Sequence, residues 1–253
     1  MIRITTLMAA AAVSVAAMAQ TEFNKTTAEG YFLGHDADGN LTFAVSGKAD
    51  YDMPAPSTSG LAALDEALLT SAGIKTDASG IVFNYLPGEG AERVDAAAFA
   101  SAVASGNPKT AYHVDTRIDK VAETPHYISM RASSNTKSLT PDGYDISTVE
   151  YVNYNKDTDA VIDYFDVFNA SAERRLREMM YPIAAKKYAL TLESSDDMEI
   201  VPNFAITPEG VTFCFPESSI APASAGCPEI TLSWQQLRSG RTLAEGVDAL
   251  LAQ

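Results

Sequence analysis

Histidine, serine and acidic side chains are the groups through which this chain could catalyse hydrolysis. The histidines are His35, His113 and His126. A Ser-His-Asp triad needs a histidine held beside a serine, which no spacing in the chain fixes, and none of the three lies in a His-Glu-x-x-His zinc motif. The 33 acidic residues offer too many carboxylate pairs to single out one for glycoside hydrolysis. We therefore predict no catalytic residue, no metal ligand and no cofactor, and we place the histidines on strand faces or on the surface.

The segment Asp36-Ala37-Asp38-Gly39-Asn40 resembles the start of a calcium-binding loop. An EF-hand loop ends with a glutamate at its twelfth position, and that position here is Gly47, which carries no carboxylate. An Asp-Gly pair between two apolar runs is also typical of a hairpin turn. We therefore predict a hairpin turn rather than a metal site at 36–40.

Two cysteines, Cys214 and Cys227, could form a disulfide bond. Each lies in or beside an aromatic and β-branched run that is typical of a strand. An antiparallel pairing with Cys214 opposite Cys227 would place Val211 opposite Ile230, so that apolar residues face each other. We predict a structural disulfide in this register. The alternative is a pair of free, buried thiols.

The loop between these two runs, Pro216 to Gly226, is the strongest candidate for a ligand-binding segment. It is rich in small and apolar residues, and loops at the ends of sheets often contact ligands. We predict that Ile220, Pro222 and Gly226 bind a ligand. The alternative is that the loop packs on the core.

The first nineteen residues have the layout of a secretory signal peptide. Arg3 supplies the positive start, an apolar stretch follows, and Ala17-Met18-Ala19 is a small-x-small cleavage pattern before Gln20. A membrane-spanning helix needs about 20 apolar residues, and polar residues arrive too early for one. No cysteine lies near the cleavage site to carry a lipid. We predict a cleaved signal peptide at 1–19, no later membrane span, and a periplasmic or secreted protein.

The composition is that of an acidic globular protein. Hydrophobic residues make up 46% of the 253 residues and charged residues 20%, which is enough apolar material for a core. The formal net charge is −15, from 33 acidic and 18 basic side chains. Such a chain repels phosphate backbones, so we predict no nucleic-acid partner. It would attract a basic protein.

Hydrophobic periodicity divides the chain into helices and strands that must position these candidates. The longest predicted helix is 170–190, which Pro182 interrupts, and shorter helices are predicted at 60–71, 92–105 and 242–251. Alternating residues predict strands separated by turns, and 133–143 reads as a polar loop. The predicted strand regions are the hairpin 29–49, the strands 80–86, 112–118 and 126–132, the hairpin 146–155 with 160–165, and the strands within 204–234.

Helices and strands do not alternate as regular βαβ units. We therefore predict the α+β class, with a mainly antiparallel sheet and two to four helices. We divide the mature chain into an N-terminal α/β portion at 20–109 and a C-terminal α+β domain at 110–253. One compact unit formed by both is the alternative.

The C-terminal strands resemble the C-terminal block of the family called domain of unknown function 3298 (DUF3298). A strand at 204–213 leads into Ile220-Ala221-Pro222-Ala223-Ser224-Ala225-Gly226, and a second strand reaches Leu237. In that family a strand, a loop of the type Ile-Ala-Pro-Tyr-Ala-x-Gly and a second strand occur in this order. Upstream, 149–154 is similar to one of its paired strands, and Asp166-Val167-Phe168 to its link into the long helix. The resemblance covers roughly 110–238.

The resemblance implies recognition at the bacterial cell wall rather than catalysis. Domains of this family occur in a membrane anti-sigma factor that senses lysozyme, and beside deacetylases that act on peptidoglycan. The chain departs from the family pattern at 138–144, where a Gly-Gly-Ala-His segment is usual and no histidine is present. A function that rests on that histidine cannot be transferred.

Together these observations predict an exported, non-catalytic binding or sensing module of the cell envelope. The predicted partner is a basic, lysozyme-like protein or a peptidoglycan fragment. The alternatives are a cell-wall-directed hydrolase or esterase, and a structural partner in an envelope complex.

Overall fold

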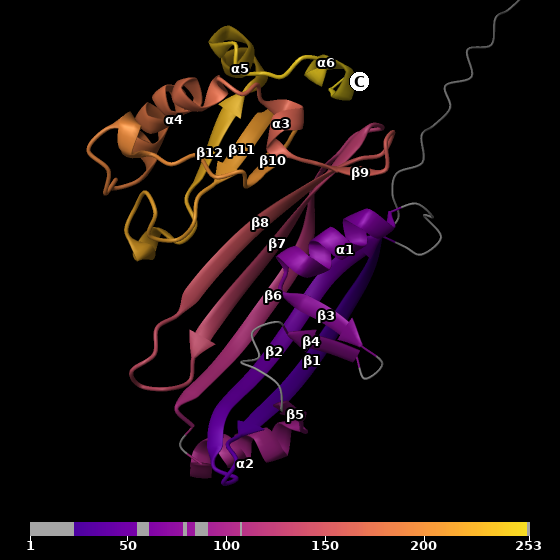
Figure 1. Cartoon of the computed structure of the whole chain (residues 1–253), viewed down its shortest axis with the longest axis vertical. Helices are drawn as coiled ribbons and strands as arrows, with labels where there is room; N and C mark the ends of the chain where they lie inside the picture. Colours follow the sequence, from indigo (N-terminus) through magenta and orange to yellow (C-terminus); the bar gives the residue numbers. More distant parts are fainter. Residues whose placement is uncertain (1–22, 55–60, 78–79, 84–90, 107, 252–253) are drawn as a thin grey trace, which may run out of the picture.

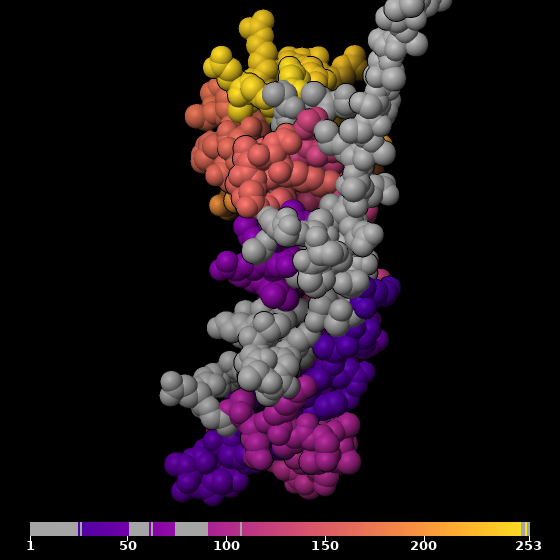
Figure 2. All heavy atoms as spheres, turned by 90° about the vertical axis from the view of Figure 1, so that its right-hand side faces the viewer, coloured from indigo at the N-terminus to yellow at the C-terminus, as the bar shows by residue number. Residues whose placement is uncertain are grey.

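The computed structural model describes residues 23–54, 61–77, 80–83, 91–106 and 108–251. The predicted signal peptide at 1–19 lies outside these residues. The molecule is elongated (Figures 1 and 2). A long, twisted sheet forms its body, helix α2 lies at one end, and a C-terminal lobe, residues 163–251, lies at the other.

Seven strands form the main sheet. All neighbouring strands are antiparallel except β2 and β6, which are parallel. The connection between these two strands contains α1 (Ala62–Ser71), β3 (Ile74–Asp77), β4 (Gly80–Phe83), β5 and α2 (Ala96–Gly106). In spatial order the strands are β5 (Ala91–Arg93), β1 (Phe23–His35), β2 (Leu41–Pro54), β6 (Thr110–Glu123), β7 (Tyr127–Ser138), β8 (Ile146–Asn155) and β9 (Ala160–Ile162).

The turn between β1 and β2 is built by the aspartate that begins it. A side-chain oxygen of Asp36 accepts hydrogen bonds from the backbone N–H groups of Asp38 (3.0 Å) and Asn40 (2.8 Å). Gly39 has a φ of +80°, which glycine adopts without steric cost. The predicted hairpin turn is therefore present, and the carboxylate of Asp36 is used within the turn.

Helix α1 covers one face of the sheet. Its residues Leu64 and Leu68 are fully buried, and Ala72 joins them against apolar side chains from five strands. These strand residues are Phe32, Ala49, Ile118, Ile128, Met130, Ala132, Val152 and Tyr154. The three-residue and four-residue spacings along α1 place its leucines on the side that faces the sheet.

The C-terminal lobe packs a three-stranded antiparallel sheet against helices. Its strands are β10 (Phe204–Ile206), β11 (Gly210–Cys214) and β12 (Glu229–Ser233). An aromatic cluster fills the core, with Phe168 and Phe213 ring centroids 5.3 Å apart. The helices are α3 (Tyr164–Val167), α4 (Ala172–Lys187), α5 (Trp234–Gly240) and α6 (Val247–Leu250), with short 3-10 turns at Ser195–Asp197 and Ala223–Ala225.

A buried asparagine joins the lobe to the main sheet. Asn153 on β8 is 3% exposed. Its Nδ2 donates to the carbonyl oxygen of Phe204 (2.6 Å), and its Oδ1 accepts from the N–H of Ile206 (2.9 Å) and from Oγ of Ser129 (2.6 Å). The Asn153 side-chain amide thereby satisfies two backbone groups of β10, the Phe204 carbonyl oxygen and the Ile206 N–H, which would otherwise need a neighbouring strand.

Side chains from the lobe also cover the outer edge of β8. Asn203 accepts a hydrogen bond from the N–H of Tyr151 (2.8 Å) and donates one to the carbonyl oxygen of Val149 (2.6 Å). Glu217 accepts one from the N–H of Ser147 (2.8 Å). Because an exposed strand edge carries unpaired backbone groups, these contacts fix the lobe beside β8.

The predicted fold class, α+β with a mainly antiparallel sheet, is confirmed. The predicted polar loop at 133–143 is wrong in its first part, because β7 continues to Ser138 between β6 and β8. The predicted strand at 160–165 ends at Ile162, where α3 begins its turn. In the part of the chain that the structure describes, no helix is long and apolar enough to cross a membrane. The division at 109/110 stays a prediction; β2 and β6 pair across it.

Candidate functional site

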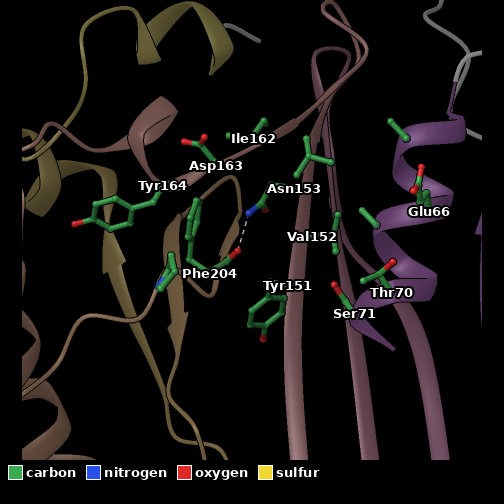
Figure 3. Close-up of a pocket in the computed structure, with 14 residues that line it drawn as sticks. Glu66, Thr70, Ser71, Tyr151, Val152, Asn153, Ile162, Asp163, Tyr164 and Phe204 are labelled. Atoms are coloured by element: carbon green, nitrogen blue, oxygen red, sulfur yellow. Dashed lines mark hydrogen bonds between the residues drawn. The ribbon is translucent and has the colours of Figure 1, made fainter. Parts of the chain in front are cut away.

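A cleft of about 540 Å³ lies between α1 and the C-terminal lobe. Figure 3 shows Glu66, Thr70 and Ser71 on one side and Asp163 and Tyr164 on the other. The remaining lining residues are Ala63, Ala67, Tyr151, Val152, Asn153, Val161, Ile162, Pro202 and Phe204. A cleft of this size fits a small ligand rather than a protein domain.

The cleft exists because β9 is short. Its three residues pair with Asn153, Tyr154 and Asn155, so β8 has no strand neighbour on this side at Tyr151 and Val152. After Ile162 the chain turns away into α3, since Asp163 caps that helix. The carboxylate of Asp163 accepts from the N–H of Phe165 (2.8 Å), and the Asp163 N–H donates to Asp166 (2.9 Å). This capping box fixes Asp163 at the cleft.

Helix α1 supplies the opposite wall through small and polar residues. Ala63, Glu66, Ala67 and Thr70 lie at helical spacing on one side of the helix, beside the leucine stripe that faces the sheet. The two alanines leave space that longer side chains would fill. Glu66 and Thr70 are exposed, so their carboxylate and hydroxyl groups are available to a ligand.

The floor of the cleft is mainly apolar and buried. Val152, Ile162 and Phe204 are at most 5% exposed, and the Asn153 amide is held by Phe204 (2.6 Å), as the dashed line in Figure 3 shows. The Tyr151 hydroxyl donates to Glu229 (2.7 Å). Burial, followed by this contact with Glu229, raises the pKa of Tyr151, so the tyrosine remains neutral at neutral pH.

A second pocket of about 400 Å³ shares Tyr164 and Pro202 with the cleft. The ring of Phe165, 68% exposed, lines it together with Glu173 and Glu199. Burial, followed by the charge of Glu173, raises the pKa of Tyr164 to about 12. Aromatic and carboxylate side chains therefore line the surface of the lobe from the cleft into the second pocket.

The side chains that line the cleft are of the types that bind a small ligand through hydrogen bonds and apolar contacts. Carboxylates accept hydrogen bonds from hydroxyl, amide and ammonium groups, and the apolar floor suits the carbon skeleton of a ligand. The residues that line the cleft include no histidine and no cysteine, and Asp163 is occupied with its helix cap. A nucleophile hydrogen-bonded to a general base is the signature of covalent hydrolysis, and among the described lining residues no hydroxyl group is hydrogen-bonded to a lining carboxylate.

His113 is placed between a serine and an aspartate. Its Nδ1 lies 2.9 Å from Oγ of Ser46, and its Nε2 lies 3.3 Å from Oδ1 of Asp115. A hydrolase triad has an accessible serine and a buried carboxylate. Here Ser46 is 4% exposed, whereas the Asp115 side chain is 45% exposed, so the order of burial is reversed. His126 contacts Asp157 (2.8 Å), and His35 lies exposed at the end of β1.

The three residues predicted to bind a ligand have different surroundings. Ile220 is 2% exposed and packs in the core of the C-terminal lobe. Pro222 is exposed, and Gly226 has a φ of +66° at the end of a 3-10 turn. None of the three lines the cleft. Their ligand-binding role stays a prediction, and only Pro222 and Gly226 have access to solvent.

The predicted register of the cysteine strands is wrong. Cys214 pairs with Glu229 rather than with Cys227, and Val211 pairs with Leu232. The pairing is shifted by two residues, which places Phe213 opposite Ile230 and keeps the apolar residues on the core face. Both cysteines are free thiols in this structure. The disulfide stays a prediction.

The sequence analysis did not select the residues that line the cleft. A usable signal was present in the predicted helix 60–71, where Ala63 and Ala67 lie beside Glu66 and Thr70 rather than beside apolar residues. The position of Asp163 opposite this helix follows from the length of β9, which the sequence pattern did not define.

Residues 156–235 match the sequence model of DUF3298, described as a protein of unknown function. No curated protein matches the chain. Two solved structures of DUF3298 family proteins have similar folds. The protein from Pseudomonas aeruginosa is 15% identical, with a TM-score of 0.54, and the alignment covers 90% of this chain and 96% of that one. The protein from Bacteroides fragilis is 12% identical, with a TM-score of 0.57 and coverages of 92% and 98%. The predicted resemblance to DUF3298, expected over roughly 110–238, is confirmed, and the sequence model matches 156–235 of that range. The two solved structures show a similar fold.

Proposed function

We propose that this chain, whose residues 156–235 carry a DUF3298 domain, is an exported, non-catalytic binding or sensing domain of the bacterial cell envelope. Its ligand is a soluble peptidoglycan fragment, which enters the cleft between α1 and the C-terminal lobe. The observation that carries this proposal is the composition of the cleft: the exposed carboxylate of Glu66 and hydroxyl of Thr70 line one wall, beside an apolar floor.

Size and chemistry favour a wall fragment over a whole protein as the occupant of the cleft. A specific protein interface covers about 800 Å² on each partner, whereas a cleft of about 540 Å³ encloses a ligand of a few rings. Peptidoglycan fragments carry hydroxyl, amide and amino groups, all of which donate to an exposed carboxylate such as that of Glu66. The signal peptide pattern supports export to the compartment where such fragments occur.

A basic, lysozyme-like protein is the second candidate partner. The observation in its favour is the formal net charge of −15, which would steer a basic protein toward this one. Such a partner would use an exposed surface rather than the cleft. The two candidates therefore differ in whether blocking the cleft abolishes binding.

The test is a binding titration of residues 20–253 against soluble muropeptides and against lysozyme, at low and at physiological salt. Thr70→Trp places a large ring in the cleft and is expected to weaken muropeptide binding by more than about tenfold. Glu66→Gln removes one charge and is expected to weaken it less. Ser101→Trp is the matched control for Thr70→Trp, and Glu92→Gln is the matched control for Glu66→Gln. Ser101 lies on α2 and Glu92 on β5, and both are exposed at the end of the molecule far from the C-terminal lobe.

Saturable muropeptide binding that survives physiological salt and is lost in Thr70→Trp alone supports the proposal. Equal affinity in Thr70→Trp and Ser101→Trp would remove the cleft as the site. Binding of lysozyme alone, unchanged by Thr70→Trp, would establish the protein partner instead. Release of smaller fragments from the muropeptides would establish the hydrolase alternative.

A further inference from the structure

The two cysteines lie at the two ends of one loop and meet. Cys214 ends β11 and is fully buried. Cys227 lies two residues before β12 and is half-buried. Although the strand register pairs Cys214 with Glu229, the loop returns so that the two thiols are neighbours that shift each other's pKa. Two neighbouring thiols are the starting arrangement for a disulfide.

Cys227 lies against the open edge of β8. Its Sγ–H donates to the carbonyl oxygen of Ser147 (3.3 Å), which favours the thiol form, while the backbone N–H groups of Glu217 and Val149 favour negative charge on the sulfur. Backbone N–H groups and a neighbouring thiol stabilise negative charge on sulfur. The hydrogen bond from Cys214, together with these N–H groups, lowers the pKa of Cys227, although burial and the Glu217 carboxylate oppose this.

Cys214 has the opposite surroundings. It is enclosed in the lobe, and its hydrogen bond to Cys227, together with burial, raises its pKa. The charged groups that face it are Glu229, which raises the pKa further, and Arg131, which lowers it. Cys227 is therefore the more exposed thiol and has its pKa lowered, whereas Cys214 is enclosed and has its pKa raised.

We propose that Cys227 and Cys214 form a thiol–disulfide exchange site, in which Cys227 attacks and Cys214 resolves. The substrate is a small or protein disulfide, such as that of an oxidising thiol–disulfide oxidoreductase in the compartment to which the protein is exported. This inference rests on the proposed export but not on the cleft or its ligand.

The exchange occurs in two steps. The Cys227 thiolate attacks one sulfur of the disulfide R–S–S–R, so the Cys227–S–R bond forms, the S–S bond breaks, and R–S⁻ leaves and takes up a proton. Cys214 then attacks Sγ of Cys227, so the Cys214–Cys227 bond forms, the Cys227–S–R bond breaks, and the second R–S⁻ leaves and takes up the Cys214 proton. Two electrons pass from the two protein thiols to the disulfide, which becomes two R–SH.

The experiment treats the reduced chain, residues 20–253, with oxidised glutathione and follows intact mass and thiol labelling. The wild type is expected to lose the mass of two hydrogen atoms and both labelling sites. In Cys214→Ser the resolving thiol is absent, so Cys227 is expected to accumulate as a stable mixed disulfide with glutathione. In Cys227→Ser the remaining thiol is buried, and its reaction is expected to be at least tenfold slower until the protein is unfolded.

A measurement on the wild type guards against variants that fail to fold. Acid quenching at early times, followed by peptide mapping, identifies the cysteine that carries the first glutathionyl group. An adduct on Cys227 supports the proposal, and an adduct mainly on Cys214 reverses the roles. A wild type that remains a dithiol while an unfolded sample is oxidised would overturn the proposal.

Discussion

Asp65 shows how one buried carboxylate sets a pH dependence. It lies in the first turn of α1, where the helix dipole favours negative charge by about 0.3–1 kcal/mol. Its Oδ1 is nevertheless buried without a hydrogen-bond partner in the described structure, and burial raises the pKa of this carboxyl group. Burial and the helix dipole therefore act in opposite directions on this pKa.

The sign of the resulting stability change follows from the two pKa values. The unfolded chain releases the Asp65 proton near the ordinary aspartate pKa of about 4, and the folded chain releases it at higher pH. The free energy of unfolding therefore falls as pH rises through this window and stays lower above it. We expect Asp65→Asn to be more stable than the wild type by about 0.5 kcal/mol at pH 7, with the difference vanishing near pH 3.

Urea denaturation of both proteins at several pH values measures this difference. Glu66→Gln, at the exposed neighbouring position, is the control and should change stability little. An Asp65→Asn variant that is less stable than the wild type at pH 7 would show that the dipole contribution is the larger one.

At the scale of elements, the junction between the main sheet and the C-terminal lobe depends on Asn153. Its amide forms three hydrogen bonds within a region that excludes water, to Phe204, Ile206 and Ser129. Replacing it with alanine leaves buried N–H and carbonyl groups unpaired, each at a cost of about 1–3 kcal/mol. We expect Asn153→Ala to lower the free energy of unfolding by more than about 3 kcal/mol.

Chemical denaturation followed by the fluorescence of Trp234, the single tryptophan, measures this loss on the side of the lobe. Asn203→Ala is the matched comparison, because Asn203 makes two hydrogen bonds to the same strand and is only half-buried. It is expected to cost less. Equal, small effects of both substitutions would mean that the aromatic packing of the lobe, rather than these amides, sets the junction.

The elements also show what the sequence could predict. Alternation from Tyr112 to Asp119 correctly indicated β6, because one of its faces is apolar and the other polar. The second half of β7, which includes Ser133, Asn135 and Lys137, has the composition of a loop. It is a strand only because β6 and β8 pair with it on both sides. Local composition could not reveal that tertiary pairing.

The candidate site was less predictable for the same reason. Its walls come from α1 and from the segment after β9, which are about a hundred residues apart in the sequence. Neither carries a motif. By contrast, the contact between Cys214 and Cys227 follows from a short loop, so the sequence indicated that pair even though the predicted strand register was wrong.

For the whole molecule, the excess of acidic residues is the dominant electrostatic property. The formal net charge is −15, so the negative side chains repel one another in the compact folded state. Added sodium chloride screens this repulsion over about 10 Å at 0.1 M. We therefore expect the melting temperature to rise by about 2–5 °C between low and moderate salt.

Differential scanning calorimetry in sodium chloride measures this shift. Sodium sulfate at equal ionic strength is the comparison, because sulfate also strengthens apolar burial and should raise the melting temperature further. A melting temperature that falls as sodium chloride is added would mean that attractive ion pairs, such as the one between Lys156 and Glu123 (2.6 Å), outweigh the repulsion.

The parallel pairing of β2 with β6 has a consequence for the order in which the chain assembles. Paired residues along it, such as Ser46 and His113, are 67 positions apart in the sequence, whereas the other long neighbours in the sheet are joined by short turns. Closing so long a loop costs about 2 kcal/mol more entropy than closing a tight hairpin. We therefore expect the β1–β2 hairpin and the β6–β9 meander to form early from local contacts, and the pairing of β2 with β6 to be the late, rate-limiting step of folding.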